Sequence, residues 1–552
     1  MGNSLRAADA AVRVLEEFGV RYAFCVPGES FLGLLDALAG SAIQVVAARH
    51  EGGAAFMAEA VGKLTGMPAL CMGTRGVGSS NLAVGIHTAH QDSTPMLAML
   101  GQVETPFRHR EAFQEVELAA FLGELTKWAV EVPGGERLPD LVAEGVRRAV
   151  TGRPGPVALA LRGDILDEPA PGDVPAVGAL PASAPRAEDT REALRLLAGA
   201  KRPLVIAGEG VLRDRATDAL VRLAERTGLP VVTGFRRHDA FPNDHPLYLG
   251  SLSIGAPPCV LERARAADVV LALGSRLDHT TTQGYTVPAP GAALIQAIDA
   301  PESLGQSFPA RLAIAAGAGE TIEALLAAAS EVDWPDRSTE NRRDREAFVA
   351  ATTPPAASTV PELVDPALVI AEMQRQLPAD AVITTDAGNF YTWLSRYYRF
   401  RRPGTFLGPI SGAMGYAVPS AVAAALVRDS QVPVVACAGD GGFMMTGNEL
   451  AVAAQLGLRV TCLVFDNAMY GTIRMHQERE YPGRVSATEL WSPNLARYAE
   501  AFGGIGIRID DDADVADGLR AALEHPGIAV VQIAVSREAI AAGRSLSAER
   551  AG

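Results

Sequence analysis

The amino-acid sequence predicts an α/β protein with three doubly wound domains whose sheets are mainly parallel. Three observations lead to this fold class. Apolar runs of strand length alternate with amphipathic runs of helix length along the 552 residues, as in sheets that helices cover on both faces. Several apolar runs end in polar, glycine-rich turns, and open α/β sheets bind their ligands at that edge. Two segments without periodicity divide the chain, and its length suits about three domains.

Short apolar runs predict the strands of each domain, and Pro, Gly or polar residues end them. These runs span residues 22–26, 43–48, 69–72, 96–100 and 158–161 in the first domain, 203–207, 269–273 and 294–299 in the second, and 381–385, 434–438 and 460–465 in the third. Amphipathic segments between them, such as residues 7–19, predict helices. The first and third domains share an organisation, because in both the buried strands end in polar, glycine-rich turns.

The two non-periodic segments set the predicted domain limits. The first is rich in proline, alanine and glycine, and the second is charged and then rich in proline. The predicted parts are, in order, an N-terminal domain at 1–165, a linker at 166–186, a central domain at 187–332, a second linker at 333–362, a C-terminal domain at 363–540 and a tail at 541–552.

The bulk composition narrows the class of protein. With 48% hydrophobic and 20% charged residues, each domain can bury a core. The net charge of −15 argues against binding to nucleic acid or to acidic membrane surfaces. The five cysteines have no paired spacing, which predicts buried free thiols in a reducing compartment. Arg13, Glu16 and Glu17 interrupt the apolar N-terminal region, so no signal peptide is expected, and no apolar run reaches membrane-spanning length. We expect a cytoplasmic protein.

The most informative stretch is a pair of apolar strands that both end in polar residues. Residues 434–438 lead into Gly439-Asp440-Gly441-Gly442, and residues 460–465 lead into Asp466 and Asn467. A carboxylate and an amide oxygen at neighbouring strand ends suit a hard cation such as Mg²⁺. The glycines let the backbone approach a phosphate closely. An ordinary glycine turn of an α/β protein is the alternative for this stretch taken alone.

The spacing of these residues resembles a known signature. Gly439-Asp440-Gly441, then 25 residues, then Asn467 is similar to the signature of thiamine-diphosphate-dependent enzymes. The resemblance to their acetolactate synthase-like (large subunit) branch covers nearly the whole chain, although the family usually has Asn where Asp466 stands. It implies a pyrimidine-binding N-terminal domain, a Rossmann-like central domain and a diphosphate-binding C-terminal domain. It also implies that Asp440, Asn467 and the backbone carbonyl of Met469 bind Mg²⁺.

The same resemblance assigns cofactor contacts elsewhere in the chain. Glu51, which follows an apolar strand, matches the glutamate that activates the thiamine ring through a hydrogen bond; the alternative is an ordinary acid in the first turn of a helix. Met414 matches the apolar side chain that wedges between the two cofactor rings, and the Gly412 carbonyl would accept a hydrogen bond from the exocyclic amine. Met414 as core filler is the alternative. The remaining cofactor contacts expected from the resemblance are Gly388, Asn389, Gly439, Gly441, Gly442, Tyr470 and Gly471.

The substrate side departs from the synthase pattern. Glu29 stands where decarboxylases of the family carry an acid and the synthases a glycine, so it could donate a proton; a solvated acid at a helix start is the alternative. Phe113 and Gln114 resemble the synthase substrate loop, where pyruvate decarboxylases have paired histidines. His476 stands about where the synthases have a tryptophan that shapes the acceptor pocket. The expected catalytic residues are Glu51, Glu29 and Gln114, and the expected substrate contacts are Glu29, Ser30, Phe113, Gln114, Ile473 and His476.

The resemblance implies an enzyme that makes or breaks carbon–carbon bonds of 2-oxo acids with thiamine diphosphate and Mg²⁺. Decarboxylation followed by addition to a second carbonyl ranks first, and a non-ligating 2-oxo acid decarboxylase or a 2-hydroxyacyl lyase is the alternative. A non-catalytic cofactor-binding protein is disfavoured by Glu51. The family builds each site between two subunits, with Glu51 from one and Asp440 from the other, so a homodimer or tetramer is expected.

The central domain raises the question of a flavin, because acetolactate synthases hold a non-redox FAD there. Gly208-Glu209-Gly210 follows an apolar strand, as in a dinucleotide-binding turn. Arg213 stands where the fingerprint requires its next glycine, and residues 251–255 replace the family's flavin segment. FAD is therefore doubtful. The broken fingerprint also argues against a nicotinamide-dependent oxidoreductase.

Overall fold

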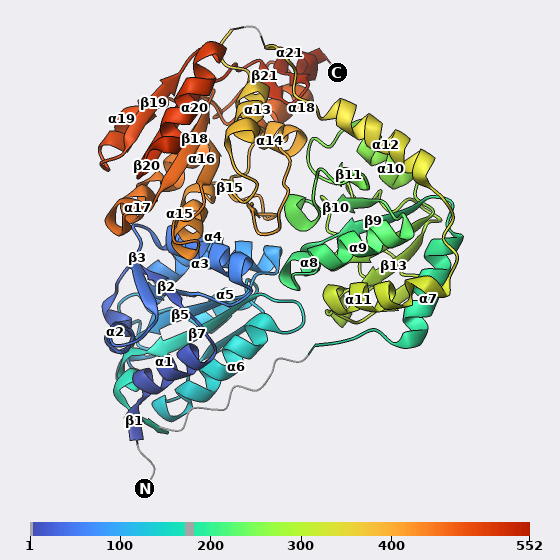
Figure 1. Ribbon diagram of the computed structural model, residues 1–552. Coiled ribbons are helices and arrows are strands. Elements are labelled where there is room, and N and C mark those ends of the chain that lie inside the picture. The colour runs from blue at the N-terminus through green and yellow to red at the C-terminus, as the bar shows by residue number, and fades with distance from the viewer. Residues whose placement is uncertain (1–3, 172–181, 361, 552) are drawn as a thin grey trace.

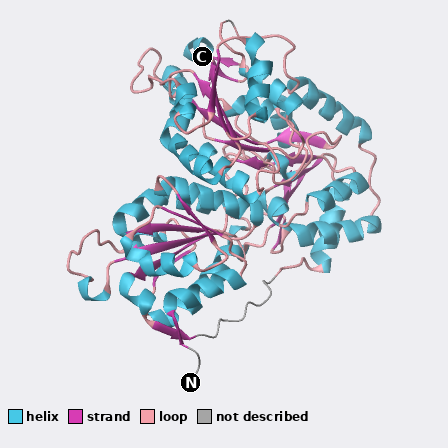
Figure 2. Cartoon of the chain, turned by 60° about the vertical axis from the view of Figure 1, so that its left-hand side comes forward, coloured by secondary structure: helices cyan, strands magenta, loops and turns pink. Residues whose placement is uncertain are grey.

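The computed structural model describes residues 4–171, 182–360 and 362–551 (Figure 1). Its three main sheets are parallel and six-stranded, one in each domain, and helices pack on both faces. Figure 2 shows the strands of the first domain as one layer between helices. Apolar residues fill these strands because parallel strands are buried on both faces. The predicted class of three doubly wound α/β domains is confirmed.

The first domain has the strand order β3-β2-β4-β5-β7-β6. Its strands are β2 (Tyr22–Cys25), β3 (Gln44–Ala47), β4 (Leu70–Thr74), β5 (Met96–Gln102), β6 (Trp128–Glu131) and β7 (Pro156–Arg162). Its helices are α1 (Ala7–Glu17), α2 (Leu32–Ala39), α3 (Glu51–Thr65), α4 (Arg75–Asp92), α5 (Leu118–Gly123) and α6 (Leu138–Val150). Helices α1, α2 and α6 share one core on one face of the sheet, and α3 and α4 belong to the core on the other face.

The middle sheet has the order β11-β10-β9-β12-β13-β14. Numbered along the domain this is 3-2-1-4-5-6, the order of the dinucleotide-binding fold, so the Rossmann-like prediction is confirmed. The strands are β9 (Pro203–Ala207), β10 (Val231–Thr233), β11 (Tyr248–Ser251), β12 (Val269–Leu273), β13 (Ala293–Ala297) and β14 (Leu312–Ile314). The helices are α7 (Ala187–Gly199), α8 (Glu209–Arg213), α9 (Thr217–Thr227), α10 (Pro258–Arg265), α11 (Ala318–Ala328) and α12 (Ser338–Ala351).

The third sheet has the order β16-β15-β17-β18-β20-β19 and so repeats the connectivity of the first. Its strands are β15 (Val382–Thr385), β16 (Phe406–Leu407), β17 (Val434–Gly439), β18 (Val460–Asp466), β19 (Ile505–Ile509) and β20 (Ile528–Ala534). The helices are α13 (Pro366–Gln376), α14 (Tyr391–Tyr397), α15 (Ala417–Val427), α16 (Asp440–Thr446), α17 (Leu450–Leu456), α18 (Gly471–Glu480), α19 (Leu495–Glu500), α20 (Val515–Glu524) and α21 (Leu546–Ala551). Small strands pair β1 (Ser4–Arg6) with β8 (Pro169–Pro171), and β21 (Ala539–Ala541) with β22 (Arg544–Ser545).

The first and third domains share one continuous core. Helix α15 packs against α3, and side chains of both helices belong to the same cluster of buried residues (Figure 1). The Phe56 and Tyr416 rings meet edge to face across this joint, 5.5 Å apart. This packing fixes the two ligand-binding sheet edges of one chain relative to each other.

Helices extend into the segments that the sequence predicted to be a linker and a tail. Helix α12 lies within the linker predicted at 333–362, because Phe348 packs against Tyr248 and Asp344 forms an ion pair with Arg263 at 3.0 Å. Strand β22 and helix α21 lie within the tail predicted at 541–552, where Leu546 is buried. Few residues of either helix are buried, Asn341 and Phe348 in α12 and Leu546 and Glu549 in α21, so these segments show little periodicity in the sequence. Residues 172–181 of the linker predicted at 166–186 lie outside the described residues.

The cysteines are free, as predicted. Four are buried and Cys259 is half-buried. Burial raises the pKa of Cys25 to about 11 and that of Cys71 to about 12, so these thiols are unreactive near neutral pH. Among the helices of the described residues, none has the length and apolar character that a membrane crossing requires.

Candidate active site

A pocket opens at the carboxyl edge of the third sheet, where β15, β17 and β18 end. It contains about 940 Å³ of empty space, part of it open to solvent, a size suited to a cofactor. Every residue that the sequence assigned to the diphosphate, the wedge and the metal lines this pocket. These are Gly388, Asn389, Gly412, Met414, Gly439, Asp440, Gly441, Gly442, Asn467, Met469, Tyr470 and Gly471. The predicted substrate residue Ile473 lines it as well.

The glycine turn lies close to its neighbours and leaves no room for side chains. Strand β17 ends at Gly439 and helix α16 begins directly at Asp440. A Cβ on Gly441 would lie 2.6 Å from a ring carbon of Tyr470, and one on Gly442 would overlap a carboxylate oxygen of Asp386. Only glycine fits at both positions, so the backbone itself forms the pocket wall, where a phosphate can approach it.

The oxygen donors at the strand ends fit a hard cation. Strands β17 and β18 are paired up to Gly439 and Phe465, so Asp440 and Asn467 follow neighbouring strands by one or two residues. The Asp440 carboxylate accepts a hydrogen bond from Ser492 Oγ at 2.7 Å, and burial raises its pKa to about 6. A carboxylate that is costly to ionise alone is stabilised by a bound cation, and carboxylate and amide oxygens are the donors that Mg²⁺ prefers.

Asp466 has a structural task. Its carboxylate accepts hydrogen bonds from Gln532 Nε2 at 2.7 Å and from the Ala468 N–H at 3.1 Å. Asp466 is not among the residues that line the pocket. The departure from the family's usual Asn therefore leaves the donor set of Asp440 and Asn467 intact.

Asp386 is a buried acid next to the pocket-lining Gly442, and sequence reasoning missed its side chain. Its Oδ1 accepts a hydrogen bond from the Ala417 N–H at 2.6 Å, while Oδ2 is buried without a hydrogen-bond partner in the described residues. Burial raises the pKa of this carboxyl group to about 6. The Asp386 carbonyl accepts from Arg236 Nη2 of the middle domain at 2.8 Å. Its position at the end of strand β15 was the available signal, since Asp440 stands at the equivalent place after β17.

The loop around Met414 is fixed by its backbone. Gly412 and Gly415 have φ angles of 72° and 82°, which glycine adopts without strain. Thr446 Oγ1 donates to the Gly415 carbonyl at 2.7 Å. Met414 is half-buried and lines the pocket, so it is not core filler. Across the pocket, Asn389 Oδ1 accepts from Thr472 Oγ1 at 3.0 Å, which ties two of the pocket's loops together.

Glu51 lies at the equivalent edge of the first sheet and away from this pocket. It begins α3, and Asn81 Nδ2 of α4 donates to its Oε2 at 2.9 Å. The buried Glu449 carboxylate holds the turn before it, accepting from the His50 N–H at 2.9 Å and the Arg49 N–H at 3.1 Å. Sequence reasoning missed Glu449 because its partners are about 400 residues away. Among the described residues, none of the first domain lines the cofactor pocket.

Three predicted substrate residues, Glu29, Phe113 and Gln114, lie at the first sheet edge, beside an arginine that the sequence did not single out. Glu29 pairs with Arg75 Nη1 at 2.8 Å. The Arg75 guanidinium lies 5.9 Å from the centre of the exposed Phe113 ring. The Gln114 carbonyl accepts from the Gly76 N–H at 3.0 Å. Arg75 stood in a glycine-rich strand end, and its ionisable side chain at the edge of the sheet was the available signal.

Two predicted substrate residues lie elsewhere. Ser30 is buried and shares a 2.6 Å hydrogen bond with Thr74, so it supports the strand ends instead of facing a ligand. His476 is on the exposed side of α18, hydrogen-bonded to Arg479 at 2.6 Å and outside the pocket lining. Both placements have one cause: sequence position shows which loop or helix carries a residue but not the direction of its side chain.

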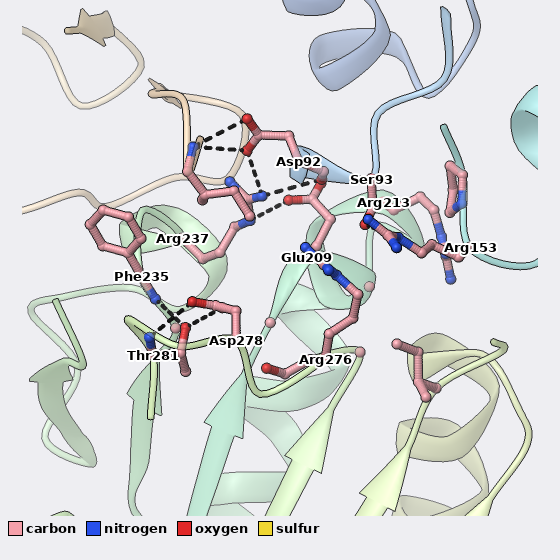
Figure 3. A pocket seen from close by; sticks show the side chains of 18 of the residues that line it. Asp92, Ser93, Arg153, Glu209, Arg213, Phe235, Arg237, Arg276, Asp278 and Thr281 are labelled. Atoms are coloured by element: carbon pink, nitrogen blue, oxygen red, sulfur yellow. Dashed lines mark hydrogen bonds and ion pairs between the residues drawn. The ribbon is translucent and has the colours of Figure 1, made fainter. Parts of the chain in front are cut away.

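Figure 3 shows a charged crevice where β9 and β12 of the middle domain end, opposite the end of α4. Arg237 pairs with Asp92 of the first domain at 2.9 Å and with Glu209. Asp92 also pairs with Lys63 of α3 at 3.0 Å. These buried pairs connect the middle domain to the first.

The glycines beside this crevice are explained by packing. A Cβ on Gly210 would lie 2.7 Å from Gly274 Cα, and one on Gly208 would lie 2.6 Å from the Gly274 carbonyl oxygen. Arg213, at the position of the missing fingerprint glycine, pairs with Asp299 at 3.1 Å. The turn after β9 therefore needs its glycines to approach the turn after β12, whether or not a ligand binds there.

Glycine turns, oxygen donors and an apolar wedge at one sheet edge define an α/β enzyme that binds a phosphorylated cofactor. The chain belongs to the thiamine pyrophosphate enzyme family and is a thiamine-pyrophosphate-dependent enzyme of the acetolactate synthase type. The N-terminal TPP binding domain of that family matches residues 5–121, the central domain residues 190–325 and the C-terminal TPP binding domain residues 386–533.

Curated relatives match over almost the full chain. A probable acetolactate synthase large subunit of Methanocaldococcus jannaschii is 30% identical, over 94% of this chain and 90% of that protein. The acetolactate synthase of Mycobacterium bovis is 32% identical, over 93% and 85%. The acetolactate synthase isozyme 2 large subunit of Escherichia coli is 30% identical, over 96% of both chains.

Proposed function

We propose that this enzyme uses thiamine diphosphate and Mg²⁺ to decarboxylate a 2-oxo acid and to join the remaining carbon unit to a second carbonyl compound. The observation that carries the proposal is the convergence of Asp440, Asn467, Met414 and the glycine turn in one pocket. The names of the relatives support the substrate class. When bound, thiamine diphosphate supplies the electron sink for carbon–carbon bond cleavage.

The residues of the chain have distinct tasks in this proposal. Asp440, Asn467 and the Met469 carbonyl hold Mg²⁺, and the glycine turn admits the diphosphate. Met414 would pack against the two rings of the cofactor. Glu51 holds a proton beside the aminopyrimidine, and Asn81 orients its carboxyl group. Glu449 fixes the turn from which Glu51 projects.

The proposal requires at least two chains, because no described residue of the first domain lines the cofactor pocket. A second copy brings its Glu51 to the Asp440 pocket, so we expect a homodimer or tetramer. Exposed apolar side chains accompany both half-sites, with Val77 and Val84 on α4 and Met444 and Met445 on α16.

Subunit mixing tests this arrangement. Glu51→Gln and Asp440→Ala subunits are each inactive alone, but a mixed dimer contains one site with both residues intact. Recovery of activity after the two variants are unfolded and refolded together supports the shared site. A mixture that associates and stays inactive contradicts it.

A decarboxylase without ligation, or a 2-hydroxyacyl lyase, is the second candidate. It is favoured by Glu29, an acid at the sheet edge that also carries Gln114. The deciding experiment incubates the loaded enzyme with pyruvate and measures acetolactate and acetaldehyde together, for the wild type and Glu29→Gly. Acetolactate as the main product of the wild type supports ligation, and acetaldehyde alone supports the second candidate. If neither forms, pyruvate is not the donor.

The enzyme is proposed to work without FAD. Arg213 stands where the dinucleotide-binding fingerprint requires a glycine, and it pairs with Asp299. The nearby glycines are needed for packing between the turns. Flavin absorbance in the purified protein, or saturable FAD binding to it, would contradict this. The buried free cysteines suit a reducing compartment such as the cytoplasm.

A further inference from the structure

Arg75 lies among the ends of four neighbouring strands in the first domain. The order β3-β2-β4-β5 places Glu51 after β3, Glu29 after β2, Arg75 after β4 and Gln114 in the loop after β5. The carboxyl ends of neighbouring parallel strands meet at one edge of the sheet. These four residues bring two acids, an amide and a cation to this edge.

The Arg75 side chain is held from two sides. Its Nη1 donates to Glu29 Oε1 at 2.8 Å, and its guanidinium lies 5.9 Å from the centre of the Phe113 ring. Its backbone has a φ of 38°, a strained value that persists where the surroundings impose it and that clusters at functional sites. The side chain is 17% exposed, whereas that of Glu29 is 58% exposed.

Two polar atoms beside this ion pair have no hydrogen-bond partner in the described residues. They are Arg75 Nε and Gln114 Oε1, and both are buried. The Gly76 N–H, next to Arg75, bonds the Gln114 carbonyl at 3.0 Å, so the two side chains belong to adjacent backbone. A buried guanidinium with a free N–H can take a second, planar acceptor such as a carboxylate.

The same helix approaches Glu51. A Cβ on Gly78 would lie 3.3 Å from Glu51 Oε1, and Asn81 bonds the carboxylate itself. On α4, Arg75 thus lies three residues before Gly78 and six before Asn81, the residues next to the group proposed to hold the cofactor's proton. A substrate that reacts beside Glu51 comes within reach of the Arg75 side chain.

We infer that Arg75 binds a carboxylate group of the substrate that remains in the product, with Glu29 as its partner in the free enzyme. This inference rests on the proposed function. A carboxylate that leaves as CO₂ is a poor partner, because an ion pair would stabilise the ground state more than the transition state. Exchanging Glu29 for a substrate carboxylate costs little, since an exposed ion pair is weak. The retained carboxylate belongs either to a 2-oxo acid acceptor or to a dicarboxylic donor.

The test compares acids with their esters on enzyme loaded with thiamine diphosphate and Mg²⁺. The acceptor arm uses pyruvate as donor with 2-oxobutyrate or its methyl ester, and the donor arm uses 2-oxoglutarate or its 5-methyl ester. Arg75→Gln should raise the half-saturating concentration of the acid in one arm about 10- to 100-fold, the size of a charge-assisted hydrogen bond, and leave the ester unchanged. Arg75→Lys should recover part of the loss, because it keeps the charge without the fork.

Two further variants keep the inference open to contradiction. Arg13→Gln, on the exposed face of α1, makes the same change of charge away from the edge and should change nothing. Glu29→Gln should lower the half-saturating concentration of the acid up to about fivefold, since it removes a competitor of exposed-pair strength. If Arg75→Gln fails to fold, the decrease in half-saturating concentration expected for Glu29→Gln tests the inference instead. An equal loss for acid and ester in Arg75→Gln, or no shift in either variant, overturns the inference.

Failure of the proposed function would look different. A wild-type enzyme that turns over no 2-oxo acid contradicts that function alone. The carboxylate site is then tested without turnover, by calorimetric binding of malonate and its monomethyl ester to the loaded wild type and Arg75→Gln. Binding of malonate that does not depend on Arg75 overturns the inference.

Discussion

The first and third domains share one strand connectivity but present different edges to a ligand. The edge of the third sheet is a concave pocket walled by glycine backbone, and its acids are buried, with the pKa values of Asp386 and Asp440 raised to about 6. The edge of the first sheet is a rim of side chains, where Glu29 is 58% exposed and Phe113 is 73% exposed. Connectivity places both sites at a carboxyl edge, and the residues of the turns decide whether that edge encloses a cofactor or faces a partner.

The largest expected effect falls on the third edge. Asp440→Ala removes the only carboxylate proposed to bind the metal, so Mg²⁺-dependent affinity for thiamine diphosphate should fall by more than about 100-fold, since even residues that only orient metal ligands are worth about 10- to 100-fold. Calorimetry measures it. Asp466→Asn is the matched control, because that carboxylate bonds Gln532 and a backbone amide, and it should keep the affinity nearly unchanged. An equal loss of cofactor affinity in the two variants would contradict the assignment of metal binding to Asp440 and not to Asp466.

The second largest effect is expected from a substitution at the edge of the first sheet. Glu51→Gln should leave cofactor affinity nearly intact and slow hydrogen exchange at C2 of the bound cofactor about 10²- to 10⁴-fold, as general acid–base groups do. Nuclear magnetic resonance after rapid quenching follows this exchange. A wild-type exchange rate would mean that Glu51 only stabilises the start of α3.

Glu449 lies between the two edges and gives a pH test. Burial raises its pKa to about 7, above about 4.3 for an unfolded glutamate. Between these values the folded protein keeps a proton that the unfolded chain has lost, so stability falls as pH rises from about 4.5 to about 7. Glu449→Gln should lack this part of the pH dependence, a difference of about 4 kcal/mol in the free energy of unfolding across that pH range.

Urea unfolding at several pH values measures the slope. The control is Glu17→Gln on the exposed face of α1, which should leave the wild-type slope unchanged. A Glu449→Gln slope that matches the wild type would show that this carboxyl group ionises freely in the folded protein.

The smallest effect on activity is expected from His476, which lies away from both sheet edges. The His476 side chain is 46% exposed and bonds Arg479, so His476→Ala should change turnover of a 2-oxo acid by less than about threefold. Ile473→Ala, on the same helix but in the pocket lining, should change it more. A loss above tenfold in His476→Ala would return this residue to the acceptor site that the sequence predicted.

The sequence by itself determined the three α/β domains and the chemistry of the third edge. Strand length, apolar content and the spacing from Gly439-Asp440-Gly441 to Asn467 are local features. A strand end also fixes where its turn lies. These local features carried the resemblance to a known family, and that resemblance assigned the pocket residues.

Only the tertiary structure decided which remote side chains meet and which way they point. Glu449 bonds His50 across 399 positions, Arg75 pairs with Glu29 across 46, and Ser30 turns inward to Thr74. Helices α12 and α21 form because Phe348 and Leu546 find buried positions. The physical reason is common to all of these: burial and long-range hydrogen bonds depend on what the folded chain brings alongside a residue, and a local pattern carries no record of that.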